Sequence, residues 1–182
     1  MGTPELPSKR YQVIYADPPW SYRNKGTRAA ADKHYPTMSL PDIQALRVKD
    51  IAADDCTLFL WATFPMLQEA LATIQAWGFD YKTLAFVWVK QNRRSHSFFW
   101  GLGNWTRSNP EVCLLATRGK PERVSAAVHS VVFAPVGYRS AKPGEVRDRI
   151  VQLMGDVPKI ELFARSRAEG WDAWGNEVPD AE

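Results

Sequence analysis

An α/β fold is predicted, because strand-like and helical patterns alternate along the 182 residues of the chain. The strand-like runs are short, apolar and rich in β-branched and aromatic residues. The helical patterns open at prolines, and two of the three end at glycines. Because repeats and linker-like tracts are absent from the sequence, we expect one domain over residues 11–178, with a flexible N-terminus at 1–10 and a short tail at 179–182.

Six runs are expected to form the strands of one sheet, and three patterns are expected to form helices that cover it. The strands are expected at residues 12–16, 57–62, 83–89, 111–117, 130–133 and 159–164. The helices open at Pro41, Pro65 and Pro143, and the second and third end at Gly78 and Gly155. Two long segments, 21–37 and 91–109, carry no periodic pattern, which is typical of functional loops.

The first expected strand ends in the sequence Asp17-Pro18-Pro19-Trp20. Prolines lack N–H donors, so the strand has to stop at Asp17, whose carboxylate then stands where ligands bind in open α/β sheets. The prolines also leave the Asp17 and Pro18 carbonyls without ladder partners. The 6-amino group of adenine suits this arrangement, because Asp17 and Pro18 accept its two hydrogens while Trp20 stacks on the ring. The alternative is a turn in which Asp17 caps backbone groups and Trp20 fills the core.

Further motifs follow in a fixed order, and together with the DPPW motif they span about residues 11–178. They are Tyr35-Pro36-Thr37-Met38-Ser39, then residues 58–61, 86–90, 109–114, 142–143, 159–165 and 174–177. This series resembles the MT-A70 family of S-adenosylmethionine-dependent adenine N6-methyltransferases, in particular its small phage and bacterial members. Several motifs in the family's order are a stronger signal than one tetrapeptide.

The resemblance implies a single Rossmann-like class I methyltransferase domain in permuted order, with the catalytic strand N-terminal and the cofactor strand C-terminal. It implies methyl transfer from S-adenosylmethionine to the 6-amino group of adenine. The catalytic candidates are Asp17, Pro18, Pro19 and Trp20, and the substrate-binding candidates are Tyr35, Glu111, Arg94 and Arg107.

The expected cofactor contacts lie mainly in the last third of the chain. They are Asp17, Lys142, Glu161, Phe163, Arg165, Asn176 and Glu177. In the resembled family the matching lysine binds the carboxylate end of the cofactor, and the matching arginine and asparagine contact its ribose and adenine. The chain departs from eukaryotic members after Arg165, where Ser166-Arg167 stands in place of Pro-His-Asn, and at Glu177, which replaces glutamine. The alternatives are a surface charge for Lys142, a salt-bridge partner for Arg165 and a core side chain for Phe163.

The net charge of +3 is compatible with a nucleic-acid substrate, and basic residues gather in the two patternless segments. The first holds Arg23, Lys25, Arg28 and Lys33. The second holds Arg93, Arg94 and Arg107, and Lys90 comes directly before it. Aromatic residues accompany the second group at 98–100 and 105, which suits base stacking beside phosphate contact. The alternative is a solvated basic surface whose rings anchor the loop to the core.

Metal, disulfide and membrane chemistry are not indicated. His34, His96 and His129 lie far apart, and Cys56 and Cys113 each adjoin an apolar run, as buried thiols of a reducing cytoplasm do. No apolar stretch approaches the length of a membrane span.

We expect the substrate to be DNA, because the chain lacks the extra RNA-binding region of the eukaryotic members. An RNA adenosine methyltransferase and an inactive, nucleic-acid-binding subunit are the alternatives. The sequence leaves open a homo-oligomer or a partner subunit.

Overall fold

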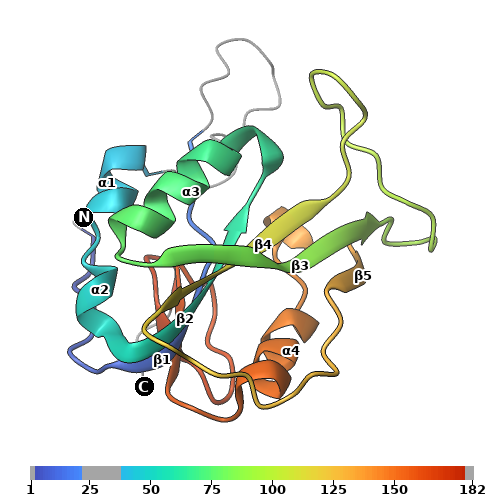
Figure 1. Cartoon of the computed structure of the whole chain (residues 1–182). Helices are drawn as coiled ribbons and strands as arrows, with labels where there is room; N and C mark the ends of the chain where they lie inside the picture. The colour runs from blue at the N-terminus through green and yellow to red at the C-terminus, as the bar shows by residue number, and fades with distance from the viewer. Residues whose placement is uncertain (1–2, 22–37, 179–182) are drawn as a thin grey trace.

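The computed structural model describes residues 3–21 and 38–178, which form one seven-stranded sheet with helices on both faces (Figure 1). The elements, in chain order, are β1 (Tyr11–Ala16), α1 (Leu40–Ala45), α2 (Val48–Ile51), β2 (Ala52–Ala62), η2 (Phe64–Met66), α3 (Leu67–Ala76), β3 (Asp80–Gln91), β4 (Glu111–Arg118), β5 (Val131–Pro135), η3 (Tyr138–Ser140), α4 (Glu145–Met154), β6 (Lys159–Leu162) and β7 (Asp172–Trp174).

The strand order is β5-β3-β4-β2-β1-β6-β7, and β4 alone runs against its neighbours β2 and β3. The other neighbouring strands pair in parallel. The carboxyl ends of the parallel strands and the amino end of β4 therefore share one edge of the sheet. The predicted α/β class and Rossmann-like architecture are confirmed.

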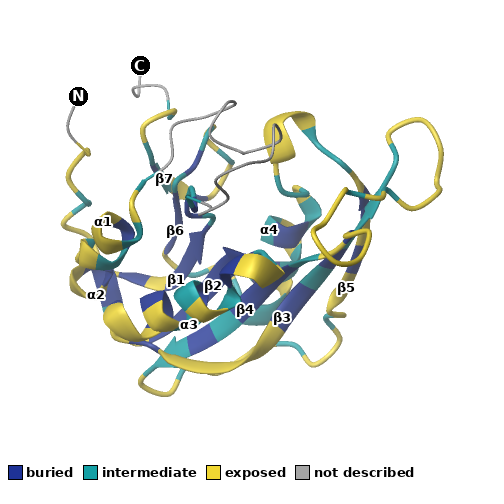
Figure 2. Cartoon of the chain, turned by 90° about the horizontal axis from the view of Figure 1, so that it is seen from above, coloured by how far each residue is buried: buried dark blue, intermediate teal, exposed yellow. Residues whose placement is uncertain are grey.

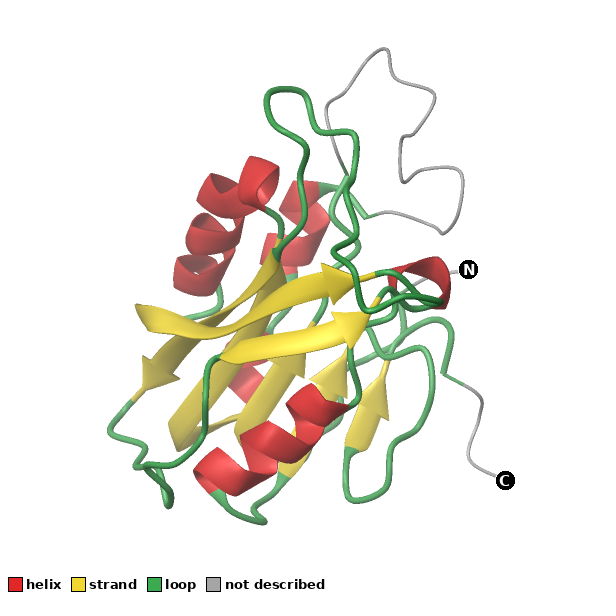
Figure 3. Cartoon of the chain, turned by 90° about the vertical axis from the view of Figure 1, so that its right-hand side faces the viewer, coloured by secondary structure: helices red, strands yellow, loops and turns green. Residues whose placement is uncertain are grey.

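Two apolar cores explain why the strands read as continuous apolar runs. Alternate residues of β1 face opposite sides: Ile14 packs with the core under α1–α3, and Tyr15 packs with the core under α4. Figure 3 shows the sheet between these two layers of helices. Burial on both faces fixes β1 at the centre of the molecule, so the group that follows it has a rigid support.

The predicted elements are found, with differences at their ends. The sixth strand was expected to reach residue 164 but ends at Leu162, because Phe163 adopts a left-handed backbone conformation with φ of 59°. The helix opened by Pro65 starts as a 3-10 turn before α3, and Gly78 ends it with φ of 84°. Two short elements, α2 and β7, were missed because three or four residues are too few to show a period.

Both cysteines are buried and unpaired, as predicted for Cys56 and Cys113. None of the helices in the described ranges is both long and apolar enough to cross a membrane.

Candidate active site

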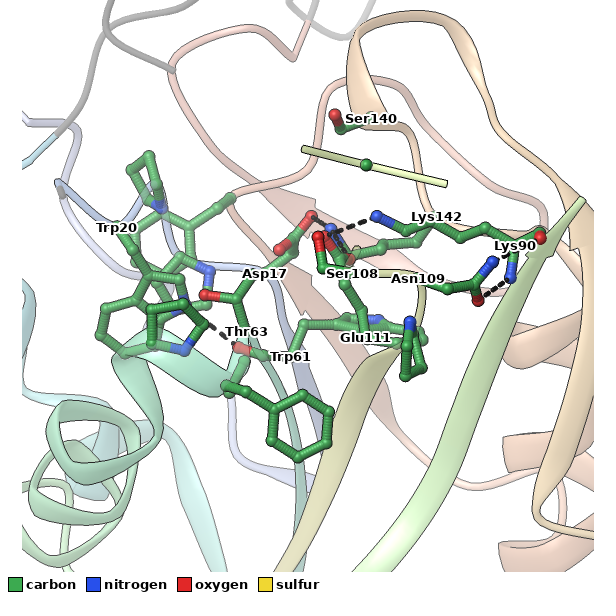
Figure 4. Close-up of a pocket in the computed structure, with 18 of the residues that line it drawn as sticks. Asp17, Trp20, Trp61, Thr63, Lys90, Ser108, Asn109, Glu111, Ser140 and Lys142 are labelled. Atoms are coloured by element: carbon green, nitrogen blue, oxygen red, sulfur yellow. Dashed lines mark hydrogen bonds and ion pairs between the residues drawn. The ribbon is translucent and has the colours of Figure 1, made fainter. Parts of the chain in front are cut away.

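A cavity of about 1210 Å³ opens at the edge where the strand ends meet (Figure 4). Its walls come from the ends of β1, β2, β4, β6 and β7 and from the loop that joins β3 to β4. Most of the residues that the sequence nominates line it: Asp17, Pro18, Pro19, Trp20, Arg107, Glu111, Lys142, Phe163, Arg165, Asn176 and Glu177. Residues far apart in the chain thus meet at one site, as expected for strand ends in an α/β sheet.

Asp17 leaves β1 directly into this cavity, and the two prolines end the strand as predicted. The Pro18 carbonyl, which was expected to lack a ladder partner, takes part in a turn. It accepts a hydrogen bond of 2.8 Å from the backbone N–H of Trp20, while the Pro19 carbonyl accepts one of 3.2 Å from Met38. The motif closes as a tight turn directly after Asp17.

The Asp17 carboxylate belongs to a row of four alternating charges. Lys142 Nζ lies 3.1 Å from Asp17 Oδ2 and 3.0 Å from Glu111 Oε2, and Lys90 Nζ lies 3.3 Å from Glu111 Oε1. Dashed lines in Figure 4 trace some of these contacts between the labelled side chains. All four side chains are mostly buried, so their interactions are stronger than those of surface ion pairs. The charges sum to zero, as a buried cluster requires.

The two lysines are held by tryptophan rings as well as by carboxylates. The Lys142 ammonium stands 5.5 Å from the Trp61 ring centre, and the Lys90 ammonium stands 5.2 Å from that of Trp88. Each indole N–H is anchored in turn: Trp61 donates to the Tyr15 hydroxyl at 2.6 Å, and Trp88 donates to the Ala134 carbonyl at 2.9 Å. The core therefore sets where both cations lie.

These surroundings shift the pKa values of the cluster in different directions. Burial raises the pKa of Asp17, the Lys142 ammonium lowers it and the Glu111 charge raises it, and the net pKa is raised. Burial also raises the pKa of Glu111, but two lysines outweigh it and the net pKa is lowered. Burial lowers the pKa of Lys142, and the two carboxylates reverse this so that its pKa is raised. Glu111 and Lys142 thus stay charged, and Asp17 is the group closest to neutrality.

Trp20 lies mainly in the core, which was the alternative to base stacking. Its side chain is 5% exposed, and its indole N–H donates to the Trp61 carbonyl at 3.1 Å. The small exposed part borders the cavity. Tyr35 and the first basic segment lie outside the described residues, so their predicted roles stay predictions.

The expected cofactor residues divide into two groups. Phe163, Arg165, Asn176 and Glu177 line the cavity. Glu161 is not among the lining residues, and Arg147 of α4 binds both its oxygens, at 2.6 and 2.9 Å. A structural role for Glu161 fits this pairing better than a cofactor contact does.

The loops that follow β6 and β7 approach each other closely beside this group. The Ala164 N–H donates to the Trp174 carbonyl at 3.0 Å, and a Cβ atom on Gly175 would lie only 2.6 Å from the Ala164 carbonyl oxygen. Phe163 is held with its ring edge-on to Trp174, at 5.3 Å between centroids. Glycine at 175 is therefore required for this side of the cavity to keep its shape.

The arginines of the second basic segment are used differently from what the sequence suggests. Arg107 lines the cavity, but its guanidinium donates to the carbonyls of Gly101 at 2.8 Å and Trp100 at 3.3 Å. Arg94 is exposed and is not among the cavity-lining residues. Lys90 was grouped with these phosphate-binding candidates, yet its ammonium faces Glu111.

Asn109 is a site residue that sequence reasoning missed. Its Oδ1 accepts from the Lys90 N–H, and its Nδ2 donates to the carbonyls of Lys90 and Phe99. In the sequence, this clamp is indicated only by an asparagine that stands before Pro110, at the start of an expected strand. Among residues 3–21 and 38–178, no three histidine, cysteine or acidic side chains gather to hold a metal ion.

Comparisons with known proteins agree with this geometry. The MT-A70 family profile matches residues 11–177. The chain is 39% identical to the type II methyltransferase M.MunI of Mycoplasma sp, over 97% of this chain and 82% of that protein. It is 30% identical to an N(6)-adenosine-methyltransferase MT-A70-like protein of Drosophila melanogaster and 29% identical to the METTL3 subunit of Danio rerio. Both matches cover 93% of this chain but only 27% and 28% of those proteins.

Proposed function

The chain belongs to the MT-A70 family of S-adenosylmethionine-dependent adenine N6-methyltransferases, and from that premise we propose that it methylates the 6-amino group of adenine in DNA. The observation that carries the proposal is the Asp17 carboxylate, presented at the end of a buried central strand and held by Lys142 inside the cavity. A carboxylate fixed in this way orients an amine, which has to present its lone pair in line with the group that it attacks.

Asp17 orients the adenine amine through one of its two carboxylate oxygens. Oδ2 is the atom bound by Lys142, which leaves Oδ1 to accept a hydrogen bond from the adenine amine. Lys142 lowers the pKa of the Asp17 carboxyl and so offsets part of the effect of burial, which still leaves the net pKa raised. Glu111 stands on the far side of Lys142 and supplies a second acceptor toward the base edge. Orientation of the amine, rather than acid–base chemistry, is the contribution of these residues to the rate.

The cavity also fits the cofactor. Its volume of about 1210 Å³ exceeds the roughly 300–1,000 Å³ typical of a site for one small ligand, so a base and a cofactor can share it. Phe163 offers a ring, and Arg165, Asn176 and Glu177 offer hydrogen-bonding groups, which together suit an adenosine moiety. Bound S-adenosylmethionine supplies the electrophilic methyl group. Lys142 has one remaining hydrogen for the carboxylate end, because its other two face Asp17 and Glu111.

DNA is favoured over RNA by the pattern of similarity. Identity to the type II methyltransferase is 39% with most of both chains aligned, whereas it is about 30% to proteins named as N(6)-adenosine-methyltransferases, of which the chain spans about a quarter. Type II methyltransferases act on DNA. We further propose a cytoplasmic location, which suits two unpaired buried thiols. A homo-oligomer and a complex with a partner subunit are both compatible with this proposal.

A labelled-methyl transfer assay tests the proposal. The purified protein is incubated with labelled S-adenosylmethionine and a matched panel of DNA and RNA, and the products are digested to nucleosides. Label in N6-methyldeoxyadenosine, absent from an Asp17→Ala control, supports the proposal. Label confined to RNA would replace DNA by RNA as substrate. No transfer to any nucleic acid, by a protein that binds the cofactor, would favour the inactive-subunit alternative.

A further inference from the structure

The loop between β3 and β4, residues 92–109, carries an unusual density of exposed apolar side chains. Trp105 is 100% exposed, and Phe98, Trp100 and Leu102 are exposed as well. In Figures 1 and 2 this loop stands clear of the body of the molecule. Single exposed apolar residues are ordinary, but several on one projecting segment indicate a binding surface.

The loop is braced in the absence of any ligand. The Gly101 N–H donates to the Ser108 carbonyl at 2.7 Å, which closes a small turn with Trp105 near its tip. Arg107 clamps the base of this turn through its bonds to the Trp100 and Gly101 carbonyls. Gly103 has φ of 45°, and a Cβ atom there would lie 2.0 Å from the Thr106 carbonyl oxygen. The hydrogen bonds and the glycine of this turn therefore keep Trp105 exposed to solvent.

The same turn forms one wall of the catalytic cavity. Every residue from Phe99 to Pro110 lines the cavity that contains Asp17. Trp105, whose side chain is fully exposed, is thus one of the residues that line the site that receives the adenine. Loop residues 92–109 include three arginines and one histidine and no acidic residue, so their charge suits a phosphate backbone rather than a basic protein surface.

On the basis of the proposed function, we propose that Trp105 enters the base stack of duplex DNA beside the target adenine. A paired adenine has to leave the stack before its amine can reach a carboxylate inside a cavity. Extrusion leaves a gap between the neighbouring base pairs, and an indole ring offers those bases a new stacking partner. Trp105 offsets the unfavourable loss of stacking, and the braced turn holds the ring where the gap opens.

This role makes Trp105 important for adenines in a duplex and dispensable for adenines in a single strand, where extrusion leaves no gap between base pairs. The test compares the same target sequence as a duplex and as a single strand. Trp105→Ala should lower methylation of the duplex by tenfold or more relative to methylation of the single strand. Trp105→Phe, which keeps a stacking ring, should recover most of that loss. Melting temperature and cofactor affinity should not change, because the ring has no contact with the core.

Tyr81→Ala is the matched control, since Tyr81 is 49% exposed near the start of β3, away from the cavity edge. Tyr81→Ala should leave the methylation rate of both substrates unchanged. Equal rates of Trp105→Ala and the wild type on the paired duplex would overturn the proposal and leave the proposed function intact. So would a wild type that methylates single strands only, because no gap then forms. A Trp105→Ala protein that changes its oligomeric state in sedimentation would overturn it in favour of a protein-binding surface. A wild type inactive on every nucleic acid would instead remove the proposed function.

Discussion

The floor of the cavity, formed by the four charged side chains, and the aromatic loop 92–109 above it are stabilised in opposite ways. On the floor, Asp17, Glu111, Lys90 and Lys142 are mostly buried, and each charge has a partner of opposite sign. On loop 92–109, large apolar side chains face solvent, and the polar groups brace the loop itself. The floor is held by sheet and core, whereas the loop is held by hydrogen bonds within it and to the end of β3.

The difference indicates a division of labour. Chemistry that depends on alignment needs side chains fixed to packed elements, and strand ends supply them. Contact with a long, variable polymer needs surface that reaches beyond the body of the protein, and a loop supplies it. If this division holds, changes on the floor should affect turnover, and changes on the loop should affect substrate handling.

The largest effect is expected from Asp17. Asp17→Ala removes the acceptor that orients the amine, and the loss should resemble that of an oriented catalytic hydrogen bond, about 10²–10³-fold in kcat. Asp17→Asn is the matched variant, with similar shape and no charge. Both should keep their melting temperature near that of the wild type, because Lys142 retains Glu111 as a partner. Near-normal turnover by a folded Asp17→Ala protein would remove the assignment.

The pH dependence tests whether the four charges act as one unit. Activity should fall as pH drops through the raised pKa of Asp17, because only the ionised carboxylate accepts the hydrogen bond. Glu111→Gln removes a negative charge that raises this pKa, so the acidic limb of the kcat profile should move to lower pH. Lys142→Met removes the cation that lowers it, so the limb should move to higher pH. Shifts in the same direction, or none, would show that the charges are not coupled to turnover.

The floor was more predictable from sequence than the loop. An apolar run that stops at two prolines places Asp17 at a strand end, and Glu111 stands at the start of another apolar run. Nothing local shows that Lys142 lies between them, because that contact needs β4 to insert antiparallel beside β2. For the loop, the aromatic residues are visible in the sequence, but their exposure depends on the Asn109 clamp and the Arg107 brace, which only the folded chain reveals.

A smaller effect on activity is expected from Asn109, which connects the loop to β3. Asn109→Ala removes two hydrogen bonds to Lys90 of β3 and one to Phe99 within the loop, and should lower the free energy of unfolding by about 1–3 kcal/mol. The KM for duplex DNA should rise more than kcat falls, and cofactor affinity should stay the same. Asn109→Asp keeps the acceptor for the Lys90 N–H and should be less damaging to kcat than Asp17→Asn. Loss of cofactor binding in either variant would show that the clamp supports the floor as well.

The smallest effect is expected from Arg94, an exposed loop residue away from the cavity lining. If Arg94 contacts a phosphate, Arg94→Ala should weaken DNA binding to a similar degree for all sequences and reduce the slope of log K against log salt by about 1. Arg107→Ala should behave differently, because its guanidinium braces the turn that carries Trp105. It should weaken methylation of paired duplex selectively, as Trp105→Ala does. Binding isotherms at several salt concentrations separate the two, and an unchanged salt slope for Arg94→Ala would assign that arginine to solvent rather than to DNA.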